Sequence, residues 1–124
     1  MQTLIQEAKD IIDKRFTENK FVVGSALRTK SGKIYTGISM NSQKLNICCE
    51  WIAIGKAFGE GEQDIDMIVA VRRHEDGRHE IYPPCGLCRE LYITYCPDVE
   101  IIVSETEKVK AKDLLPHPWI KKKR

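Results

Sequence analysis

The stretch NICCEWIAIGKA, residues 46–57, places two adjacent cysteines and a glutamate at the start of a run in which Trp51, Ile54 and Ala57 recur at helical spacing. A second pair, Cys85 and Cys88, follows two prolines and opens another short segment with a helical pattern. Clustered cysteines serve as metal ligands, as halves of a disulfide, as nucleophiles or as small apolar residues. The fold and the function both depend on which of these roles applies.

The rest of the chain alternates predicted helices and strands. Apolar residues at helical spacing predict helices over residues 3–16, 48–61 and 85–96, and a short last helix over residues 110–116. Runs rich in β-formers predict strands over residues 20–29, 33–40, 64–75 and 98–105. This order, with its short connections, predicts an α/β fold in which helices cover both faces of one sheet.

Length and composition describe one ordinary domain. The chain has 124 residues and a formal net charge of +2, which is typical of a nearly neutral globular protein. No apolar run approaches the roughly 20 residues that cross a membrane, and the first residues lack the pattern of a secretory signal. We therefore expect a cytoplasmic protein whose five cysteines stay reduced, which favours metal ligands or catalytic groups over a disulfide framework.

The spacing of three cysteines and one glutamate predicts a metal site. Cys85 and Cys88 form a C-x-x-C pair that can direct both sulfurs at one ion, whereas a redox motif of that spacing follows the first strand of a thioredoxin-like fold. Cys48 supplies a third ligand, and Glu50 follows it as C-x-E. Three cysteines beside a glutamate that does not bind the metal are typical of zinc-dependent base deaminases, with one coordination position open for water.

Two segments carry a resemblance to the cytidine deaminase superfamily: CCEWIAIGKA, residues 48–57, and PPCGLCRE, residues 83–90. Three more are similar to the family's first strand, its hairpin and its C-terminal segment: KFVVGSAL, SGKIYTG and LLPHPW. The resemblance implies a three-layer α/β/α sandwich around a five-stranded mixed sheet. It also implies that the two cysteine-bearing helices lie side by side beneath the site.

The resemblance assigns roles to the residues around the metal. It implies that Cys48, Cys85 and Cys88 hold zinc. It implies that Glu50 carries a proton to a ring nitrogen of a cytosine-like base and then to the departing amine. Cys49 occupies a position where relatives usually have alanine. Its sulfur is therefore expected to be core filler, and only its backbone N–H is expected to touch the base.

The sugar-binding motif departs from the family pattern. Free-nucleoside deaminases of the family carry N-x-E after the hairpin to hold the ribose hydroxyls, whereas this chain has Ser39-x-Asn41. This change, together with the short spacing from Gly37 to Cys48, is closer to blasticidin-S deaminases. We therefore expect a small-molecule substrate, either cytidine or a modified cytosine nucleoside such as blasticidin S, with Ser39 and Asn41 among its contacts.

Two aromatic residues match family positions near the substrate. Phe21 corresponds to a residue that packs near the base, and the alternative is simple core packing. Trp119 corresponds to a C-terminal aromatic residue that reaches the site of a neighbouring subunit, and the alternative is an anchor on its own core. The resemblance thus implies a homotetramer with shared active sites.

The charge of the expected zinc site raises a separate question. Three thiolates on one Zn²⁺ leave a net negative charge, which weakens the pull of the metal on its water. Many relatives carry an arginine directly after the glutamate, where this chain has Trp51. Arg89, next to Cys88, is a candidate for the replacement cation, and the alternative is an ordinary surface arginine.

Two other functions stay open alongside deamination of a small nucleoside. An enzyme that deaminates bases in RNA or DNA must hold flanking nucleotides. For that purpose the chain offers chiefly a basic tail, residues 120–124, after the single domain expected over residues 1–119. A non-catalytic, zinc-stabilised binding module needs a fourth protein ligand, for which Cys49 is the nearby candidate. We favour the small nucleoside, with neither nucleic acid nor membrane as a partner.

Overall fold

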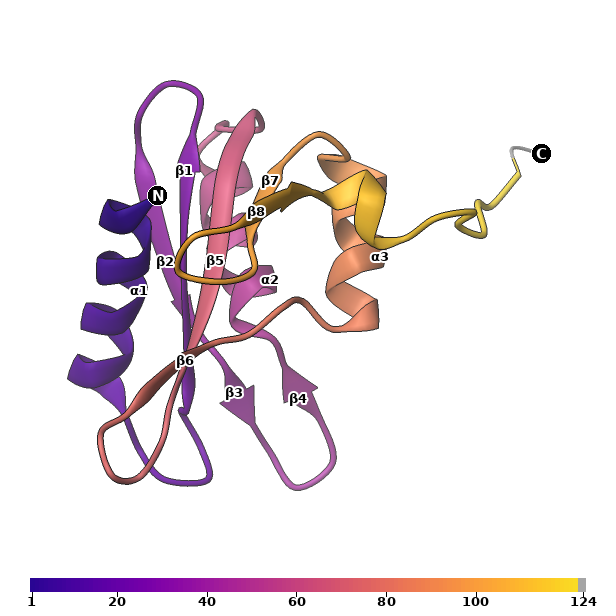
Figure 1. The fold of residues 1–124 in the computed structure, drawn as a ribbon. Helices are drawn as coiled ribbons and strands as arrows, with labels where there is room; N and C mark the ends of the chain where they lie inside the picture. Colours follow the sequence, from indigo (N-terminus) through magenta and orange to yellow (C-terminus); the bar gives the residue numbers. More distant parts are fainter. Residues whose placement is uncertain (123–124) are drawn as a thin grey trace.

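A long central strand organises the sheet in the computed structural model, which describes residues 1–122. This strand, β5 (Ile65–Arg73), is rich in β-branched residues and pairs antiparallel with β1 (Val23–Thr29). On its far side β1 pairs antiparallel with β2 (Ile34–Ile38), so that the hairpin predicted from the sequence forms one edge of the sheet. Figure 1 shows these three strands at the centre of the molecule.

Three short strands complete the other edge. β7 (Glu100–Ile102) runs parallel to β5 near its start, and β6 (His79–Ile81) runs antiparallel to its last residues. β8 (Lys108–Lys110) pairs with β7. The mixed sheet therefore has six strands, of which five form the continuous path β2-β1-β5-β7-β8. This agrees with the expected mixed sheet, while β6 and β8 arise from segments without a strand signal in the sequence.

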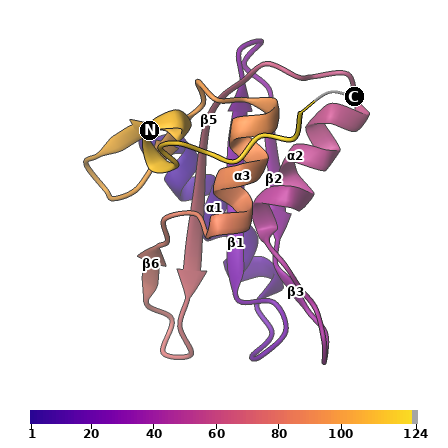
Figure 2. The same ribbon diagram turned by 90° about the vertical axis from the view of Figure 1, so that its right-hand side faces the viewer.

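Helices cover both faces of the sheet, which confirms the three-layer arrangement (Figures 1 and 2). α1 (Gln2–Arg15) lies on one face, and α2 (Cys49–Gly59) and α3 (Gly86–Tyr95) lie on the other. The apolar stripe of α1 is buried as its spacing predicts, with Leu4 and Ile12 at most 1% exposed. The burial of these stripes, on both faces, supplies the main driving force for folding.

The side chains of β5 alternate between the two layers, because successive residues of a strand point to opposite faces. Met67, Val69 and Val71 belong to the core cluster that contains the buried residues of α1. Ile68 belongs to the cluster that contains residues of α2 and α3. Even-numbered positions of β5 therefore face the two cysteine-bearing helices.

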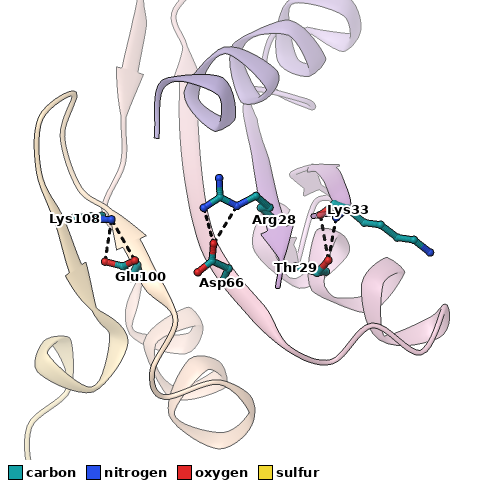
Figure 3. A network of polar contacts seen from close by, with 6 residues as sticks. All are labelled: Arg28, Thr29, Lys33, Asp66, Glu100 and Lys108. Atoms are coloured by element: carbon teal, nitrogen blue, oxygen red, sulfur yellow. Dashed lines mark hydrogen bonds and ion pairs between the residues drawn. The ribbon is translucent and has the colours of Figure 1, made fainter. Parts of the chain in front are cut away.

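Ion pairs occupy the end of the sheet where β5 begins. Arg28 donates from Nε to Asp66 Oδ2 at 3.0 Å, and Lys108 Nζ lies 3.2 Å from Glu100 Oε1 (Figure 3). The backbone N–H of Lys33 donates to the hydroxyl of Thr29 in the turn of the β1–β2 hairpin. Partly exposed pairs of this kind contribute little to stability, and they lie at the end of β5 that is remote from the site described below.

Two local features differ from the expectation. β3 (Met40–Asn41) and β4 (Asn46–Ile47) form a separate small hairpin where the sequence predicts a loop. The last predicted helix is a short 3₁₀ helix, η1 (Ala111–Leu114), after which the chain leaves the domain as an extended segment (Figure 1). Of the expected basic tail, residues 123–124 lie outside the described residues. No helix in residues 1–122 is long and apolar enough to cross a membrane.

Candidate active site

The two cysteine-bearing helices begin at the same place. Cys48 is the N-cap of α2 and Cys85 is the N-cap of α3, and both residues have extended backbone conformations. The Sγ atoms of these two residues lie 3.5 Å apart. The positive ends of two helix dipoles therefore point at one cluster of sulfurs, which favours the thiolate form that binds metals.

Three sulfurs form a triangle that fits one zinc ion. Cys88 Sγ lies 3.6 Å from Cys85 Sγ, and the Sγ atoms of Cys48, Cys85 and Cys88 all lie within 4.8 Å of one another. A tetrahedral zinc with Zn–S bonds of about 2.3 Å separates its sulfur ligands by about 3.8 Å. Among residues 1–122 these cysteines form the one group of three metal-binding side chains. The donor set matches zinc and leaves one coordination position open.

The pKa values of the three thiols respond to their surroundings. Burial raises the pKa of Cys48 to about 11, and burial raises the pKa of Cys88 further. Burial also raises the pKa of Cys85. Hydrogen bonds from the backbone N–H groups of Cys88 and Leu87, and from the thiols of Cys48 and Cys88, outweigh burial, so that the pKa of Cys85 is lowered. Burial therefore outweighs the helix dipole at Cys48, and zinc binding would have to displace the protons of Cys48 and Cys88.

Glu50 lies beside the cysteine cluster in the first turn of α2. Its side chain is 6% exposed, and it lines the same pocket as Cys48 and Cys85. Burial raises the pKa of Glu50, although a hydrogen bond from the Cys49 thiol partly offsets the effect. A carboxyl group with a raised pKa exchanges protons more readily near neutral pH than an exposed one, which is what a general acid and base requires.

The Cys49 thiol is a partner of Glu50. Its Sγ donates to Glu50 Oε1 at 3.1 Å, and the residue is 1% exposed. Burial, followed by the nearby charge of Glu50, raises the pKa of Cys49, so that the sulfur stays protonated and able to donate. The expectation that this sulfur is only core filler is therefore incomplete, because it contacts the carboxylate and orients it.

We expect Cys49→Ala to lower kcat by about fivefold while KM and zinc content stay close to those of the native chain. The reason is the loss of one weak S–H donor that holds the carboxylate, worth about 1 kcal/mol. Cys96→Ala is the matched control, because Cys96 is also buried but lies at the far end of α3. Steady-state kinetics of both variants would refute the orienting role if they gave the same kcat.

A pocket of about 260 Å³ opens above the cysteines and Glu50. Ser39 and Asn41, the substrate contacts predicted from the sequence, line its wall. The Ser39 hydroxyl also accepts a hydrogen bond from the backbone N–H of Val23 at 3.2 Å, which holds it at the end of β1. The structure thus brings the predicted metal ligands Cys48 and Cys85, the predicted proton carrier and both residues of the altered sugar motif to one cavity.

The sheet supports the first turn of α2 from below through a row of two small residues. Ser25 on β1 and Gly37 on β2 are register partners. The fully buried Ser25 hydroxyl donates to the backbone carbonyl of Cys49 at 2.9 Å. A Cβ on Gly37 would lie 2.5 Å from that same carbonyl oxygen and 2.8 Å from the Ala53 nitrogen. Only a glycine lets the helix that carries Glu50 lie this close to the sheet.

We expect Gly37→Ala to destabilise the protein by about 1–3 kcal/mol, because the added methyl group meets backbone atoms that no side-chain rotation can move. Gly55→Ala, in the middle of α2, is the matched control. A Cβ there has nothing within 4 Å, and alanine should stabilise the helix by up to about 1 kcal/mol. Urea unfolding of both zinc-loaded variants is the test, and equal midpoints would contradict the close-packing account.

Three residues singled out in the sequence lie away from the pocket walls. Phe21 is half-buried and bridges to Thr17, and it precedes the pocket residue Val22 without lining the cavity itself. Trp119 is 82% exposed and borders a separate surface hollow with α3 residues. Trp51, in the position of the expected arginine, is 41% exposed. Within one chain, neither Phe21 nor Trp119 reaches the cysteine cluster.

Arg89 bonds to backbone carbonyls. Its Nε donates to Pro84 O at 2.9 Å, and a second guanidinium nitrogen donates to Leu114 O at 3.1 Å. The side chain thereby ties the residue before Cys85 to η1. This contact positions the start of α3, and the hypothesis that Arg89 balances the thiolates stays a prediction.

Several residues that line the pocket are not among the site residues predicted from the sequence. They come from the ends of β1 and β5 and from the segment before α3: Val22, Val23, Ala70, Arg72, Tyr82 and Pro83. The alternation of β5 is a usable signal, since Ala70 and Arg72 lie two residues apart and so share the face toward α2 and α3. The order of the strands in the sheet determines which strand ends border the cavity, and the sequence does not specify that order.

The chain matches a known protein family over most of its length. The family described as the zinc-binding region of cytidine and deoxycytidylate deaminases matches residues 1–105. A blasticidin-S deaminase from Bacillus cereus is 34% identical over 122 residues, which span 91% of this chain and 87% of the relative. A cytidine deaminase from Halalkalibacterium halodurans is 31% identical over 123 residues, which span 93% of this chain and 90% of the relative.

Solved structures agree with the fold. A crystal structure of the cytidine deaminase from Bacillus anthracis superposes with a TM-score of 0.81 at 24% identity, covering 95% of this chain and 88% of the other. The structure of the cytidine deaminase from Burkholderia pseudomallei has a TM-score of 0.78 at 27% identity, covering 95% and 98% respectively. The three-layer arrangement described above is therefore shared with these proteins.

Proposed function

Since the chain belongs to the family of cytidine and deoxycytidylate deaminases, we propose that it removes the amino group of a small cytosine nucleoside, or of an analogue, by hydrolysis. The observation that carries this function is the cluster of three zinc-binding sulfurs, two of which, those of Cys48 and Cys85, belong to residues that line one pocket with the buried carboxyl group of Glu50. The products would be ammonia and the corresponding uracil compound.

Cys48, Cys85 and Cys88 are the residues that would hold zinc, with Zn–S contacts to all three sulfurs. Bound in such a site, zinc supplies a water molecule that is activated for attack near neutral pH. Cys48 and Cys85 are the N-cap residues of α2 and α3, so both ligands lie at helix starts. Cys48 and Cys85 line the cavity that also contains Glu50, so zinc held there would act on a substrate bound in that cavity.

Glu50 moves the protons in this proposal. It takes a proton from the attacking water and delivers it to the ring nitrogen next to the carbon that bears the amino group. The second proton of the water then passes through the same carboxyl group to the amine, the C–N bond breaks, and ammonia leaves as the new C=O bond forms. The Cys49 thiol holds the carboxylate through its hydrogen bond to Oε1 while both transfers occur.

The other contacts would fix the orientation of the nucleoside. The backbone N–H of Cys49, at the first turn of α2, would bind the base, as the resemblance to the family implies. Ser39 and Asn41 line the part of the pocket assigned to the sugar, where neutral donors replace the usual carboxylate. Phe21 would reach the base only by a shift of its side chain, since it does not line the cavity here.

The choice between cytidine and a modified nucleoside draws on two lines of support. The similar curated proteins are named blasticidin-S deaminase and cytidine deaminase. The change to Ser39-x-Asn41 removes the acidic group that would accept two ribose hydroxyls. We therefore place this chain with deaminases of either small molecule, with a preference for a cytosine nucleoside whose sugar differs from plain ribose.

The assembly and the compartment are part of the same proposal. Trp119 is 82% exposed, and the resemblance to the family implies that this residue would reach the pocket of a neighbouring subunit. A homotetramer with shared sites would bury this side chain and add an aromatic wall to each pocket. A cytoplasmic location would keep the three ligand thiols reduced and able to bind zinc.

The two alternative functions receive less support from the site. A closed structural zinc site needs four protein ligands, but the nearby Cys49 sulfur is hydrogen-bonded to Glu50. A polynucleotide deaminase must hold flanking nucleotides, while the similar curated proteins are named for the small molecules cytidine and blasticidin S. Deamination of a free nucleoside thus accounts for the site better than either alternative.

A substrate panel tests the proposal. The zinc-loaded protein is assayed for ammonia release with cytidine, deoxycytidine, blasticidin S, adenosine, guanine, and cytosine in single-stranded RNA and DNA. We expect release from at least one free cytosine nucleoside and none from the oligonucleotides. Release from the oligonucleotides alone, or from adenosine or guanine alone, would contradict the proposed substrate class.

A further inference from the structure

β5 ends with two adjacent arginines, Arg72 and Arg73, whose side chains lie on opposite faces of the sheet. Arg73 lies toward α1, where its guanidinium is 4.7 Å from the centre of the Phe16 ring and 3.4 Å from Asp13 Oδ1. Arg72 lies on the same face as Ala70, and both line the pocket above the cysteines. One arginine of the pair therefore has a structural partner on α1, while the other borders the cavity.

Arg72 has no ionic partner among the residues that the structure describes. Its Nε is buried and, like Arg73 Nε, has no hydrogen-bond partner in residues 1–122, but Arg72 also lacks the ion pair that Arg73 makes with Asp13. The acid directly opposite in the strand register is Glu80, whose Oε1 instead contacts His74 Nε2 at 2.9 Å. A half-buried cation without a counter-charge is costly, and such a cost at a pocket wall indicates a ligand that supplies the missing charge.

The sheet register gives the position of Arg72 relative to the reacting end of the pocket. The row Gly37–Ser25–Ala70 crosses three strands directly under the start of α2, which carries Glu50. The next row with the same orientation is Ser39–Val23–Arg72, since Ser39 N donates to Val23 O at 2.8 Å and Val23 is the register partner of Arg72. Two residues of strand advance this row by about 6.6 Å.

This second row lies where the sugar of a bound nucleoside would extend. If the amino-bearing carbon of the base is at Glu50, a sugar that extends along the pocket would lie near Ser39 and Arg72, which line the same cavity. Glu50 and Arg72 are the two charged side chains among the residues that line the pocket. The cavity therefore has an acidic group at the base end and a cationic group at the sugar end.

We propose that Arg72 binds an anionic group on the sugar side of the substrate, so that the enzyme prefers a cytosine nucleoside carrying a phosphate or a carboxylate over a neutral one. The proposal rests on the deaminase function above and names its substrate class more narrowly. Guanidinium groups bind both anions through paired N–H donors, and Arg72 offers such donors beside the neutral wall formed by Ser39 and Asn41. A neutral residue at position 41, in place of the family's acid, removes the repulsion that an anionic sugar would otherwise meet.

Binding of product-type ligands tests this preference without requiring turnover. Affinities of the zinc-loaded protein for uridine, uridine 5′-monophosphate and uridine-5′-carboxylic acid are measured by calorimetry. We expect at least one anion to bind about 10- to 100-fold more tightly than uridine, as charge-assisted hydrogen bonds allow. The anion with the higher affinity identifies the group as phosphate or carboxylate.

Three variants identify the residue responsible. Arg72→Gln should abolish most of the preference for the anion over uridine, and Arg72→Lys should keep part of it because the charge is retained. Arg73→Gln is the matched control and should keep the native preference, since this side chain faces α1. Thermal unfolding and zinc content show whether each variant is folded and loaded.

Three results would overturn the proposal. One is equal affinity of the native protein for all three ligands. Another is an equal loss of affinity for uridine and for the anions in Arg72→Gln, which would mean that Arg72 acts on the metal site or on the pocket as a whole. The third is a loss of preference in Arg73→Gln as large as in Arg72→Gln. Failure of the deaminase function shows separately, as absence of ammonia release in the substrate panel.

Discussion

Replacing Glu50 by glutamine should leave zinc in place and lower kcat by about 10²- to 10⁴-fold. The amide has nearly the same shape and can still accept the hydrogen bond from Cys49, so the helix start should keep its structure. It cannot take up a proton from water or return one to the amine, and both transfers depend on Glu50 in the proposed mechanism. The measurement is kcat on the best nucleoside, together with zinc content by metal analysis.

Glu60→Gln is the matched control, because it removes an exposed carboxylate at the opposite end of the same helix. We expect this variant to keep native kinetics. If Glu50→Gln lost its zinc together with its activity, Glu50 would be a metal ligand. If it kept more than a tenth of the native kcat, another group would have to carry the protons.

Changing Cys88 to serine should reduce bound zinc from about one ion per chain to a small fraction of that, and activity should fall in proportion. Cys88 supplies one of three sulfurs, and its own Sγ is 3.6 Å from that of Cys85. A serine hydroxyl is a far weaker zinc ligand than a thiolate, and two remaining cysteines hold the ion poorly. Metal analysis after dialysis gives the zinc content directly.

Cys96→Ser provides the comparison, because Cys96 is a buried cysteine at the C-cap of α3 and does not belong to the sulfur cluster. It should retain zinc with some loss of stability. Full zinc and full activity in Cys88→Ser would show that the three sulfurs do not form the metal site.

The sequence predicts the chemistry of this site better than its shape. The spacing of Cys48, Glu50, Cys85 and Cys88 predicts that these residues meet, and the structure brings the three sulfurs together beside Glu50, while their chemical roles stay predictions. The helices and the central strands follow from hydrophobic periods that are long and regular. The small hairpin β3–β4 and the strands β6 and β8 are two or three residues long, and they form through pairing with neighbours, which a local pattern does not reveal.

The support beneath the site was inaccessible to sequence reasoning for a related reason. Ser25 and Gly37 matter because β1 and β2 bring them together under the Cys49 carbonyl, and this depends on strand register. The role of Arg72 depends on the same register, since only the sheet order shows which strand ends border the pocket. The sulfur of Cys49 is a different case, since a residue next to Glu50 in the sequence is a natural candidate for contact with its carboxylate.

The position of Trp119 shows another limit. The resemblance to the family implies that this residue serves a neighbouring subunit, and within one chain it is exposed and apart from the cysteine cluster. A single chain cannot supply the surface on which such a residue packs. The tetramer therefore stays a prediction.

The most direct test of the central claim is the conversion of a cytosine nucleoside by the zinc-loaded protein, followed by the ultraviolet change from cytosine to uracil and by the ammonia released. The account predicts that one ammonia appears for each cytosine consumed. It also predicts that the conversion stops when zinc is removed and returns when zinc is restored. A protein that holds zinc at Cys48, Cys85 and Cys88 and converts none of the free cytosine nucleosides, neutral or anionic, would contradict it.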